Sequence, residues 1–149
     1  MALEEYWRKR KFEKTPEPNG EIKVTEKRRF VVHDHYAEKA GHHHDFRLEM
    51  EGVLKSWAVP RLVPEEKGVK RLAISVENHP INYYNFTGTI PRGEYGAGKV
   101  KIFDKGDYKL IERDENKIVF ELKGKKLKGV YTLVKLKGRK NQWLIFKVK

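Results

Sequence analysis

Short segments in which apolar and polar residues alternate recur through most of this chain, and they constrain its fold more than any other feature. In the segment KRLAISVE, Leu72, Ile74 and Val76 fall on one side of an extended chain and the residues between them on the other. Turn signals separate the segments, such as the EG pair between DFRLEM and VLKSWAV. About eight such segments follow residue 29, among them KVKIFD and YKLIER, which we expect to be separated by a turn rich in Gly, Asp and Lys around Gly106. They predict an all-β fold, a compact antiparallel β-barrel or sandwich.

The first 28 residues differ from the rest, because they are highly charged and carry prolines at positions 16 and 18. Such a stretch indicates an arm outside the core, and its composition alone favours a frayed basic tail. A short helix is plausible only near LEEYWRKR. A length of 149 residues suits one domain, with an arm at residues 1–28 and a β-barrel at residues 29–149.

Basic side chains outnumber acidic ones, with 33 Lys and Arg against 21 Asp and Glu and a formal net charge of +12. This excess favours a polyanionic partner, nucleic acid first and an anionic membrane surface second. The chain has no cysteine, which excludes disulfides and thiolate metal sites. It has no apolar run of membrane-spanning length, and its first residues do not resemble a signal peptide. We therefore expect a cytoplasmic protein that does not act at a membrane.

The stretch GEYGAGKV, residues 93–100, comes close to a phosphate-binding P-loop. That motif requires a hydroxyl side chain after the lysine, and a helix whose N-terminus faces the phosphates. Val100 stands in the hydroxyl position, and the residues that follow alternate as in a strand. The sequence therefore argues against nucleotide hydrolysis and predicts a loop between two strands that could close over a pocket.

Five of the six histidines lie within residues 33–50, HDHYAEKAGHHHDFRLEM. In an extended strand from residue 43 onward, His43, Asp45 and Arg47 point one way and the apolar residues between them point the other. The apolar side suits a protein core. The polar side aligns an imidazole, a carboxylate and a guanidinium along one edge.

His43 and Asp45 can both reach one metal ion, and the nearest candidates for a third ligand are His35 and His33. Two imidazoles and one carboxylate leave open coordination positions, an arrangement that suits a catalytic metal. A strand slipped by one residue would instead offer one of the two histidines that flank His43. The apolar residues of the same strand favour His43.

Further polar residues favour a site that binds phosphate esters. Arg47 lies on the same face as the metal candidates, and Arg71 adds a second positive charge for a developing oxyanion. The run ENHPINYY carries His79, whose ordinary pKa suits a general acid, and Tyr83. Tyr83 either orients the phosphate or is an aromatic core residue.

Two other classes of protein fit parts of this pattern. An iron oxygenase on a β-barrel also uses two histidines and one carboxylate, although the paired arginines fit it poorly. A barrel that only binds nucleic acid would offer aromatics such as Trp57 and Tyr84 as stacking surfaces. Both aromatics also suit core or rim packing.

Two long segments resemble a known family. They are FVVHDHYAEKAGHHHDFRLEMEGVLKSWAVP and KRLAISVENHPINYYNFTGTIPRGEYGAGKV. Both are similar to the 3′-phosphoesterase domain of bacterial ligase D, an enzyme of non-homologous end joining with stand-alone relatives in archaea. The resemblance runs from RKRKFEKTPEP to QWLIFK, essentially the whole chain, and the string DFRLE-x-x-GVLKSWAVP is highly specific.

The resemblance implies a compact β-barrel with a manganese-dependent site in a polar crevice, where zinc or cobalt could take the place of manganese. The implied activity removes 3′-terminal ribonucleotides and 3′-phosphates and leaves a 3′-hydroxyl. The implied partners are nucleic-acid 3′ ends, a separate DNA ligase and other repair factors. We expect a monomer.

The resemblance also implies roles for individual residues. The implied metal ligands are His35, His43 and Asp45. The residues implied to contact or activate the phosphate are Arg47, Arg71, His79 and Tyr83. The supporting residues are Arg61, Glu77, Arg10 and Glu17. The arm that carries the last two is therefore expected to pack near the crevice.

Three departures from the family pattern stand out. The segment between His35 and His43 is about two residues longer than usual, so it is expected to bulge for both histidines to meet one ion. Lys11 replaces a usual aspartate, which alters an interaction of the arm. Arg61 stands where a lysine is usual, so the charge stays but its geometry changes.

Overall fold

The computed structural model describes residues 3–20 and 28–149; the part of the expected arm at residues 21–27 lies outside the described residues. The described residues form nine strands, one short α-helix and one 3-10 helix. In chain order these are α1 (Glu4–Arg8), β1 (Arg29–Ala37), β2 (Gly41–Met50), β3 (Val53–Val59), β4 (Lys70–His79), η1 (Ile81–Asn85), β5 (Gly88–Ile90), β6 (Gly98–Asp114), β7 (Lys117–Lys123), β8 (Lys128–Lys135) and β9 (Gln142–Lys147).

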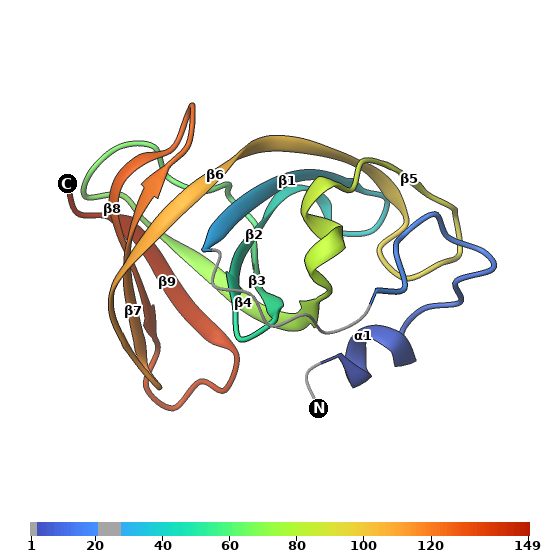
Figure 1. Cartoon of the computed structure of the whole chain (residues 1–149), viewed down its shortest axis with the longest axis horizontal. Helices are drawn as coiled ribbons and strands as arrows, with labels where there is room; N and C mark the ends of the chain where they lie inside the picture. The colour runs from blue at the N-terminus through green and yellow to red at the C-terminus, as the bar shows by residue number, and fades with distance from the viewer. Residues whose placement is uncertain (1–2, 21–27) are drawn as a thin grey trace.

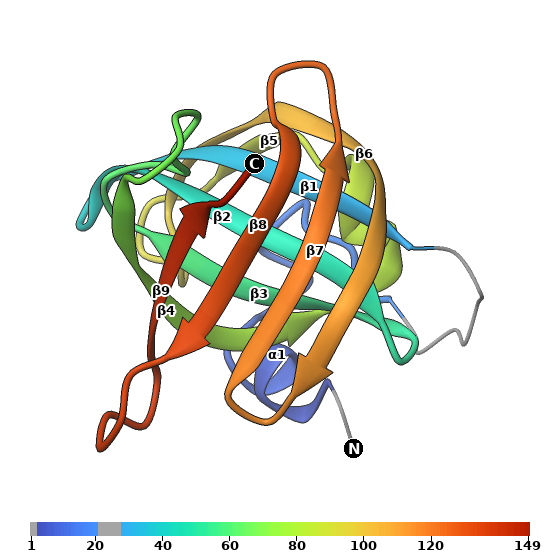
Figure 2. The same ribbon diagram turned by 90° about the vertical axis from the view of Figure 1, so that its left-hand side faces the viewer.

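The strands form one antiparallel sheet that closes on itself. Its order is β1-β2-β3-β4-β9-β8-β7-β6-β5, and an additional pairing of β1 with β6 completes a ring of eight strands, with β5 attached to the end of β6. In Figure 2, β7, β8 and β9 cross in front of β1, β2 and β3. The predicted all-β barrel is confirmed, and its closure leaves few open sheet edges.

Strand β6 differs from the sequence expectation, in which KVKIFD and YKLIER were separate segments. They form one strand of 17 residues, because the chain changes partners and does not turn: its first part pairs with β1 and β5, and its last part with β7. Gly106, which suggested a turn, lies where a Cβ atom would come within 2.5 Å of the Lys123 carbonyl oxygen. The glycine permits a close approach of two backbones.

Two hydrophobic clusters lie on opposite faces of β1. The first fills the ring and draws residues from all eight of its strands, among them Phe30, Phe46 and Phe120. The second holds Val31, next to Phe30 on β1, together with Tyr6 of the arm. Each fully buried side chain of this size contributes roughly 1.5–3 kcal/mol. The second cluster therefore fixes α1 and η1 against the outside of the barrel, and Figure 1 shows them on the side away from β7, β8 and β9.

A β-bulge in β4 changes which side chains share a face. Leu54 of β3 pairs with His79 and Ser56 pairs with Val76, so two steps along β3 oppose three along β4. The extra residue reverses the alternation of β4 beyond Val76. As a result Arg71 faces away from His79, although simple alternation had put Arg71 and Glu77 on one side.

None of the described helices is long and apolar enough to cross a membrane.

Candidate active site

A cavity of about 700 Å³ opens on the outer face of β1, β2 and β3, beside the arm and the loop between β5 and β6. Nine of the eleven side chains that the sequence suggests for a site line this cavity: Arg10, Glu17, His35, His43, Asp45, Arg47, Glu77, His79 and Tyr83. Residues 10 and 17 belong to the arm, which therefore does contact the crevice. The remaining two, Arg61 and Arg71, do not line the cavity.

The pairing of β1 with β2 brings the expected metal ligands together. His35 lies opposite His43, and His33 lies opposite Asp45. His35 Nδ1 is 3.0 Å from Asp45 Oδ2, and His43 Nε2 is 3.1 Å from Asp45 Oδ1. One ligand atom from each of these three residues lies within 4.8 Å of the others. The cluster is compact enough to hold one ion.

The expected bulge between the two histidines is absent. The pairing of β1 with β2 runs without a register shift as far as Ala37 opposite Gly41. A turn at residues 38–40 joins the two strands instead, and Gly41 after it takes a positive φ of 76°. This turn leaves the alignment of His35 and His43 undisturbed.

Hydrogen bonds to backbone carbonyls leave one free nitrogen on each histidine. The Gly96 carbonyl lies 2.7 Å from His35 Nε2, and the Gly41 carbonyl lies 3.1 Å from His43 Nδ1. Because a carbonyl can only accept, these nitrogens donate, which leaves His35 Nδ1 and His43 Nε2, on the side of Asp45, as the atoms that could bind a metal or carry the hydrogen bonds to Asp45. Such second contacts typically orient metal-bound histidines. The donor set therefore fits a divalent cation.

Asp45 keeps its negative charge despite its burial. Burial by itself would raise the pKa of Asp45, but hydrogen bonds from His35 and His43, together with the charge of Arg47, hold it well below its usual value. Burial likewise opposes a charge on His43, but the hydrogen bond to Asp45 raises the pKa of His43. A proton and a metal ion thus compete for the same place between His43 and Asp45.

A second trio, Asp34, His42 and His44, lies on the opposite face of the two strands and is also compact. It does not fit a metal in the same way. The backbone N–H of Val63 donates to His44 Nδ1 at 2.9 Å, so His44 Nε2 carries the proton and donates to Asp34 at 3.0 Å. His44 thus has no free nitrogen for a metal ion. The shifted strand register, in which His44 would replace His43 as a ligand, therefore loses its support.

Arg47 lies beside the cluster, held in place by several partners. Its Nε donates to His33 Nδ1 at 3.2 Å, its Nη1 donates to Ser56 Oγ at 2.9 Å, and its Nη2 lies 3.6 Å from Asp45 Oδ2. The side chain of Arg47 is only 3% exposed. A buried guanidinium in a fixed orientation is a strong binder of phosphate oxygens.

His79 lies between two guanidinium groups. Its Nδ1 donates to the Glu77 carbonyl at 3.0 Å, and its Nε2 accepts a 3.3 Å hydrogen bond from Arg10. Arg47 Nη1 is 3.1 Å from the same Nδ1. Burial, followed by the charges of Arg47 and Arg10, lowers the pKa of His79 well below its ordinary value. Without a bound anion the ring is therefore neutral, whereas a general acid needs a protonated ring.

The arm reaches the cavity through buried ion pairs. Arg10 pairs with Glu17 at 2.9 Å and with Glu77 at 3.0 Å, and the Tyr83 hydroxyl donates to Glu17 at 2.7 Å. Burial, reinforced by Glu17, raises the pKa of Tyr83 well above its usual value. Tyr83 therefore keeps its proton as a hydrogen-bond donor.

Arg71 instead supports the turn that follows β3. Its Nη1 donates to the carbonyl oxygens of Arg61 and, at 3.0 Å, of Leu62. Leu62 has a φ of 73°, a conformation that costs energy for a residue other than glycine. The guanidinium of Arg71 thus stabilises a strained turn, and Arg61 is exposed on that turn.

Sequence reasoning missed the residues that position Arg47. His33 was considered only as a metal ligand, but its Nε2 donates to the Phe86 carbonyl at 3.1 Å and its Nδ1 accepts from Arg47. Nothing in the segment VLKSWAV distinguishes Ser56 from an ordinary strand residue. Its place opposite Arg47 in the pairing of β2 with β3 becomes visible only once the two strands are aligned.

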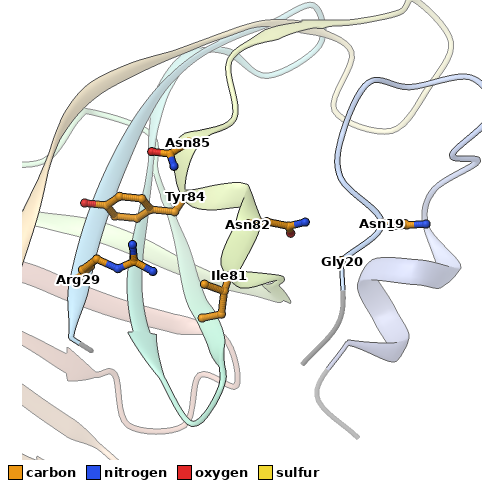
Figure 3. A pocket seen from close by; sticks show the side chains of 7 residues that line it. All are labelled: Asn19, Gly20, Arg29, Ile81, Asn82, Tyr84 and Asn85. Carbon is orange, nitrogen blue, oxygen red and sulfur yellow. The ribbon is translucent and has the colours of Figure 1, made fainter. Parts of the chain in front are cut away.

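A smaller cavity of about 350 Å³ lies beside η1 (Figure 3) and is lined by Asn19, Gly20, Arg29, Ile81, Asn82, Tyr84 and Asn85. The guanidinium of Arg29 lies 4.5 Å from the ring centroid of Tyr84. Tyr84 is 8% exposed and Trp57 is 3% exposed. Neither aromatic offers an open stacking surface, so the alternative of a barrel that only binds nucleic acid loses its best candidates.

Fold and site together define a class: a closed antiparallel β-barrel with a two-histidine, one-carboxylate cluster beside a buried arginine. Residues 33–135 match the family described as the DNA ligase D 3′-phosphoesterase domain. The chain belongs to this family, as its sequence motifs indicated.

Curated relatives agree with this assignment. The chain is 41% identical over 157 residues to the multifunctional non-homologous end joining protein LigD of Pseudomonas aeruginosa. The aligned region covers 99% of this chain and 18% of that protein. It is 42% identical over 153 residues to the LigD of Mycobacterium bovis, with 99% of this chain and 20% of that protein covered. The chain thus spans about a fifth of the length of these relatives.

Proposed function

We propose that this protein is a metal-dependent phosphoesterase that heals nucleic-acid 3′ ends in DNA repair, removing terminal ribonucleotides and 3′-phosphates to leave a 3′-hydroxyl. The observation that carries the proposal is the donor set of His35, His43 and Asp45 beside Arg47 in one cavity. Membership of the ligase D phosphoesterase family supports the same activity.

The charge of the cavity supports a role for a metal. Among the described residues, five acidic side chains line it, namely Glu17, Glu38, Asp45, Glu77 and Glu94, and four basic ones, namely Arg10, Lys39, Arg47 and Arg92. Although the whole chain is strongly basic, this cavity alone does not favour a phosphate dianion. A divalent ion held by the cluster would reverse the sign of that charge and polarise a non-bridging phosphate oxygen.

We propose manganese as this ion, with zinc or cobalt as substitutes. Two imidazole nitrogens and one carboxylate oxygen accept all three metals, and availability decides between them. Protein groups then complete the phosphate site. Arg47 binds a phosphate oxygen, and the Tyr83 hydroxyl, which donates to Glu17 in the free protein, turns its hydrogen bond to the phosphate and orients it.

His79 is our candidate for the general acid that protonates the leaving 3′-oxygen. Burial is the first cause of its low pKa, and the charges of Arg47 and Arg10 lower it further. A phosphate dianion beside the ring opposes both guanidinium groups and favours the protonated ring. The proton to be given lies on Nε2, because Nδ1 is held by the Glu77 carbonyl. Arg10 then leaves Nε2 and joins Arg47 on the phosphate.

Arg61 and Arg71 contribute to nucleic-acid binding from outside the cavity. Arg61 is exposed on the turn after β3, and we assign it a contact with the nucleic-acid strand beyond the reacting phosphate. Arg71 acts through Arg61, because it holds the backbone of that turn. The formal charge of +12 favours a nucleic-acid partner. We further propose that the protein works as a cytoplasmic monomer and that a separate ligase seals the ends it produces.

The test is a labelled primer-template whose primer ends in one ribonucleotide or in a 3′-phosphate, incubated with manganese or with a chelator. We expect a 3′-hydroxyl product only with the metal. His42→Ala is the matched control for Asp45→Ala, because His42 belongs to the second trio on the other face. Product formation at an undiminished rate after exhaustive chelation would overturn the proposal. Uptake of oxygen with iron(II) and a keto-acid would instead support the oxygenase.

A further inference from the structure

The loop between β5 and β6 holds an exposed aromatic ring at the cavity. Tyr95 is 46% exposed, and both Tyr95 and its neighbour Gly96 line the cavity. Two other large aromatic side chains are comparably exposed, Trp7 at 37% and Tyr36 at 44%, but neither lines the cavity. Tyr95 is therefore the ring among these three that a bound substrate can reach.

Two cations of the arm orient the ring of Tyr95. Lys9 Nζ lies 4.7 Å from the ring centroid and donates to the Tyr95 hydroxyl at 3.3 Å. The guanidinium of Arg10 lies 5.3 Å from the same centroid. Lys9 is itself paired with Glu77 at 3.2 Å. The contacts fix the ring from the arm side and leave almost half of its surface open to a ligand.

The same loop is tied to the candidate metal ligands. The Gly96 carbonyl accepts the 2.7 Å hydrogen bond from His35 Nε2, and the Ala97 carbonyl accepts a 2.9 Å hydrogen bond from the backbone of Glu38. Gly93 and Gly96 take positive φ values of 91° and 76°, which glycine adopts without strain. Tyr95 is thus adjacent in sequence to a residue that touches the reacting centre.

We propose that Tyr95 stacks on the base of the 3′-terminal nucleotide and thereby selects strand ends over other phosphate esters. This inference rests on the proposed function and adds a specificity-determining residue to it. Every nucleobase offers a flat face to an aromatic ring, so stacking tolerates any sequence. A cavity of about 700 Å³ is large enough for a nucleotide, and Ala37, Ala58 and Val76 add apolar surface to its wall.

The experiment is a double-mutant cycle in which the Tyr95 ring and the base of the terminal nucleotide are removed separately and together. Steady-state kinetics are measured on a primer-template with a 3′-phosphate on either a normal or an abasic terminal nucleotide, for wild type and for Tyr95→Ala. Base stacking on an aromatic ring is worth about 1–3 kcal/mol, or roughly 5- to 150-fold. We expect KM for the normal end to rise by a factor in that range in Tyr95→Ala. Removal of the base should raise KM for wild type by a similar factor. Tyr95→Ala should then raise KM for the abasic end little further.

Two control variants make the cycle specific. Tyr95→Phe and Tyr95→Trp keep a ring and should retain a low KM, which a role for the hydroxyl bond to Lys9 would not predict. Tyr36→Ala removes a comparably exposed ring that stacks on His42, with centroids 4.3 Å apart, and should leave KM unchanged.

The outcomes separate this inference from the proposed function. If wild type cleaves the normal end but Tyr95→Ala loses the same factor on normal and abasic ends, the ring does not contact the base and the inference is overturned. If wild type cleaves neither end with manganese, the proposed function itself fails.

Discussion

The hydroxyl of Tyr83 donates a 2.7 Å hydrogen bond to Glu17, 66 positions away in the sequence. The same carboxylate oxygen accepts a 2.9 Å hydrogen bond from Arg10 Nε. One buried carboxylate thus joins the arm to η1 and holds two groups that face the cavity. The charge of Arg10 is compensated inside the protein only while Glu17 and Glu77 remain in place.

Loss of the Glu17 carboxylate should therefore cost stability as well as activity. Removing one partner of a buried ion pair destabilises a protein by about 3 kcal/mol or more. We expect Glu17→Ala to lower the free energy of unfolding by about that amount in urea denaturation, and Glu17→Gln to lower it less. Glu13→Ala is the matched control, because Glu13 is exposed on the same arm. Equal stabilities of Glu17→Ala and Glu13→Ala would show that the arm is not anchored by this carboxylate.

Metal binding should be visible as thermal stabilisation, independently of catalysis. A ligand present at 100 times its Kd adds about 2.7 kcal/mol to the free energy of unfolding, so manganese should raise the Tm of the chelator-treated protein. His43→Ala and Asp45→Ala should abolish this rise. His42→Ala should keep it in full.

His44→Ala gives the sharpest contrast in the same measurement. His44 is 1% exposed and bonded to Val63 and Asp34, so its loss should lower Tm yet leave the manganese-induced rise intact. If a variant of His44 folds but its Tm no longer rises with manganese, His44 would be a metal ligand, as in the strand register shifted by one residue.

Buried neutral histidines, namely His33, His44 and His79, should make the protein sensitive to acid. Burial, with the charge of Arg47, lowers the pKa of His33 to about 3, and burial lowers the pKa of His44 to about 4. In the unfolded chain these rings take up protons near pH 6.5. Between pH 6.5 and about 4 the unfolded state binds more protons, so the free energy of unfolding falls as the pH falls.

Each of these rings should contribute a slope of about 1.4 kcal/mol per pH unit in that window. Urea denaturation between pH 7 and pH 5 in the presence of a chelator measures it. We expect His44→Gln to have a shallower slope than wild type by about one proton. His43 has the opposite sign, because its raised pKa stabilises the protein at low pH, and it is unchanged in this variant. Parallel slopes for the two proteins would contradict the assignment.

Much of the fold follows from the sequence because the alternation of apolar residues is local. Phe46 and Leu48 had to face the core, so His43 and Asp45 had to share the other face, and the pairing of β1 with β2 agrees. The position of Arg71 could not be obtained in this way. A single extra residue in β4 reverses the alternation, and the sequence KRLAISVENH contains no glycine or proline that would mark such a bulge.

The protonation states of the site residues also could not be predicted from the sequence. His79 suggested a general acid because of its ordinary pKa, but its surroundings depend on Arg10 and Arg47, which lie 69 and 32 positions away. Similarly, His33 and Ser56 acquire their role only through the orientation of Arg47. Long-range contacts of this kind depend on tertiary packing, which a pattern of alternation does not encode.

Arg61 and Arg71 should behave as one unit. If Arg71 acts only by holding the turn that carries Arg61, then Arg71→Ala in a protein that already lacks the Arg61 side chain should cost little further activity. We expect the loss of kcat/KM in the double variant Arg61→Ala, Arg71→Ala to be close to the larger of the two single losses. Lys135 of β8 does not line the cavity, so Lys135→Ala serves as the charge-matched control. Losses that multiply would mean that Arg71 contacts the substrate itself.

The role of His79 can be tested through the leaving group. If His79 gives a proton to the leaving oxygen, His79→Ala should still bind manganese but lose turnover by roughly 10²–10⁴ on a 3′-phosphate. A nitrophenolate leaves without a proton, so the same variant should hydrolyse nitrophenyl phosphate at close to the wild-type rate. The variant also removes a partner of Arg10, so His79→Gln, which keeps a hydrogen-bonding side chain near Arg10, should show the same contrast between substrates. Equal losses on both substrates would assign His79 to holding the phosphate, and the proton would have to come from another group.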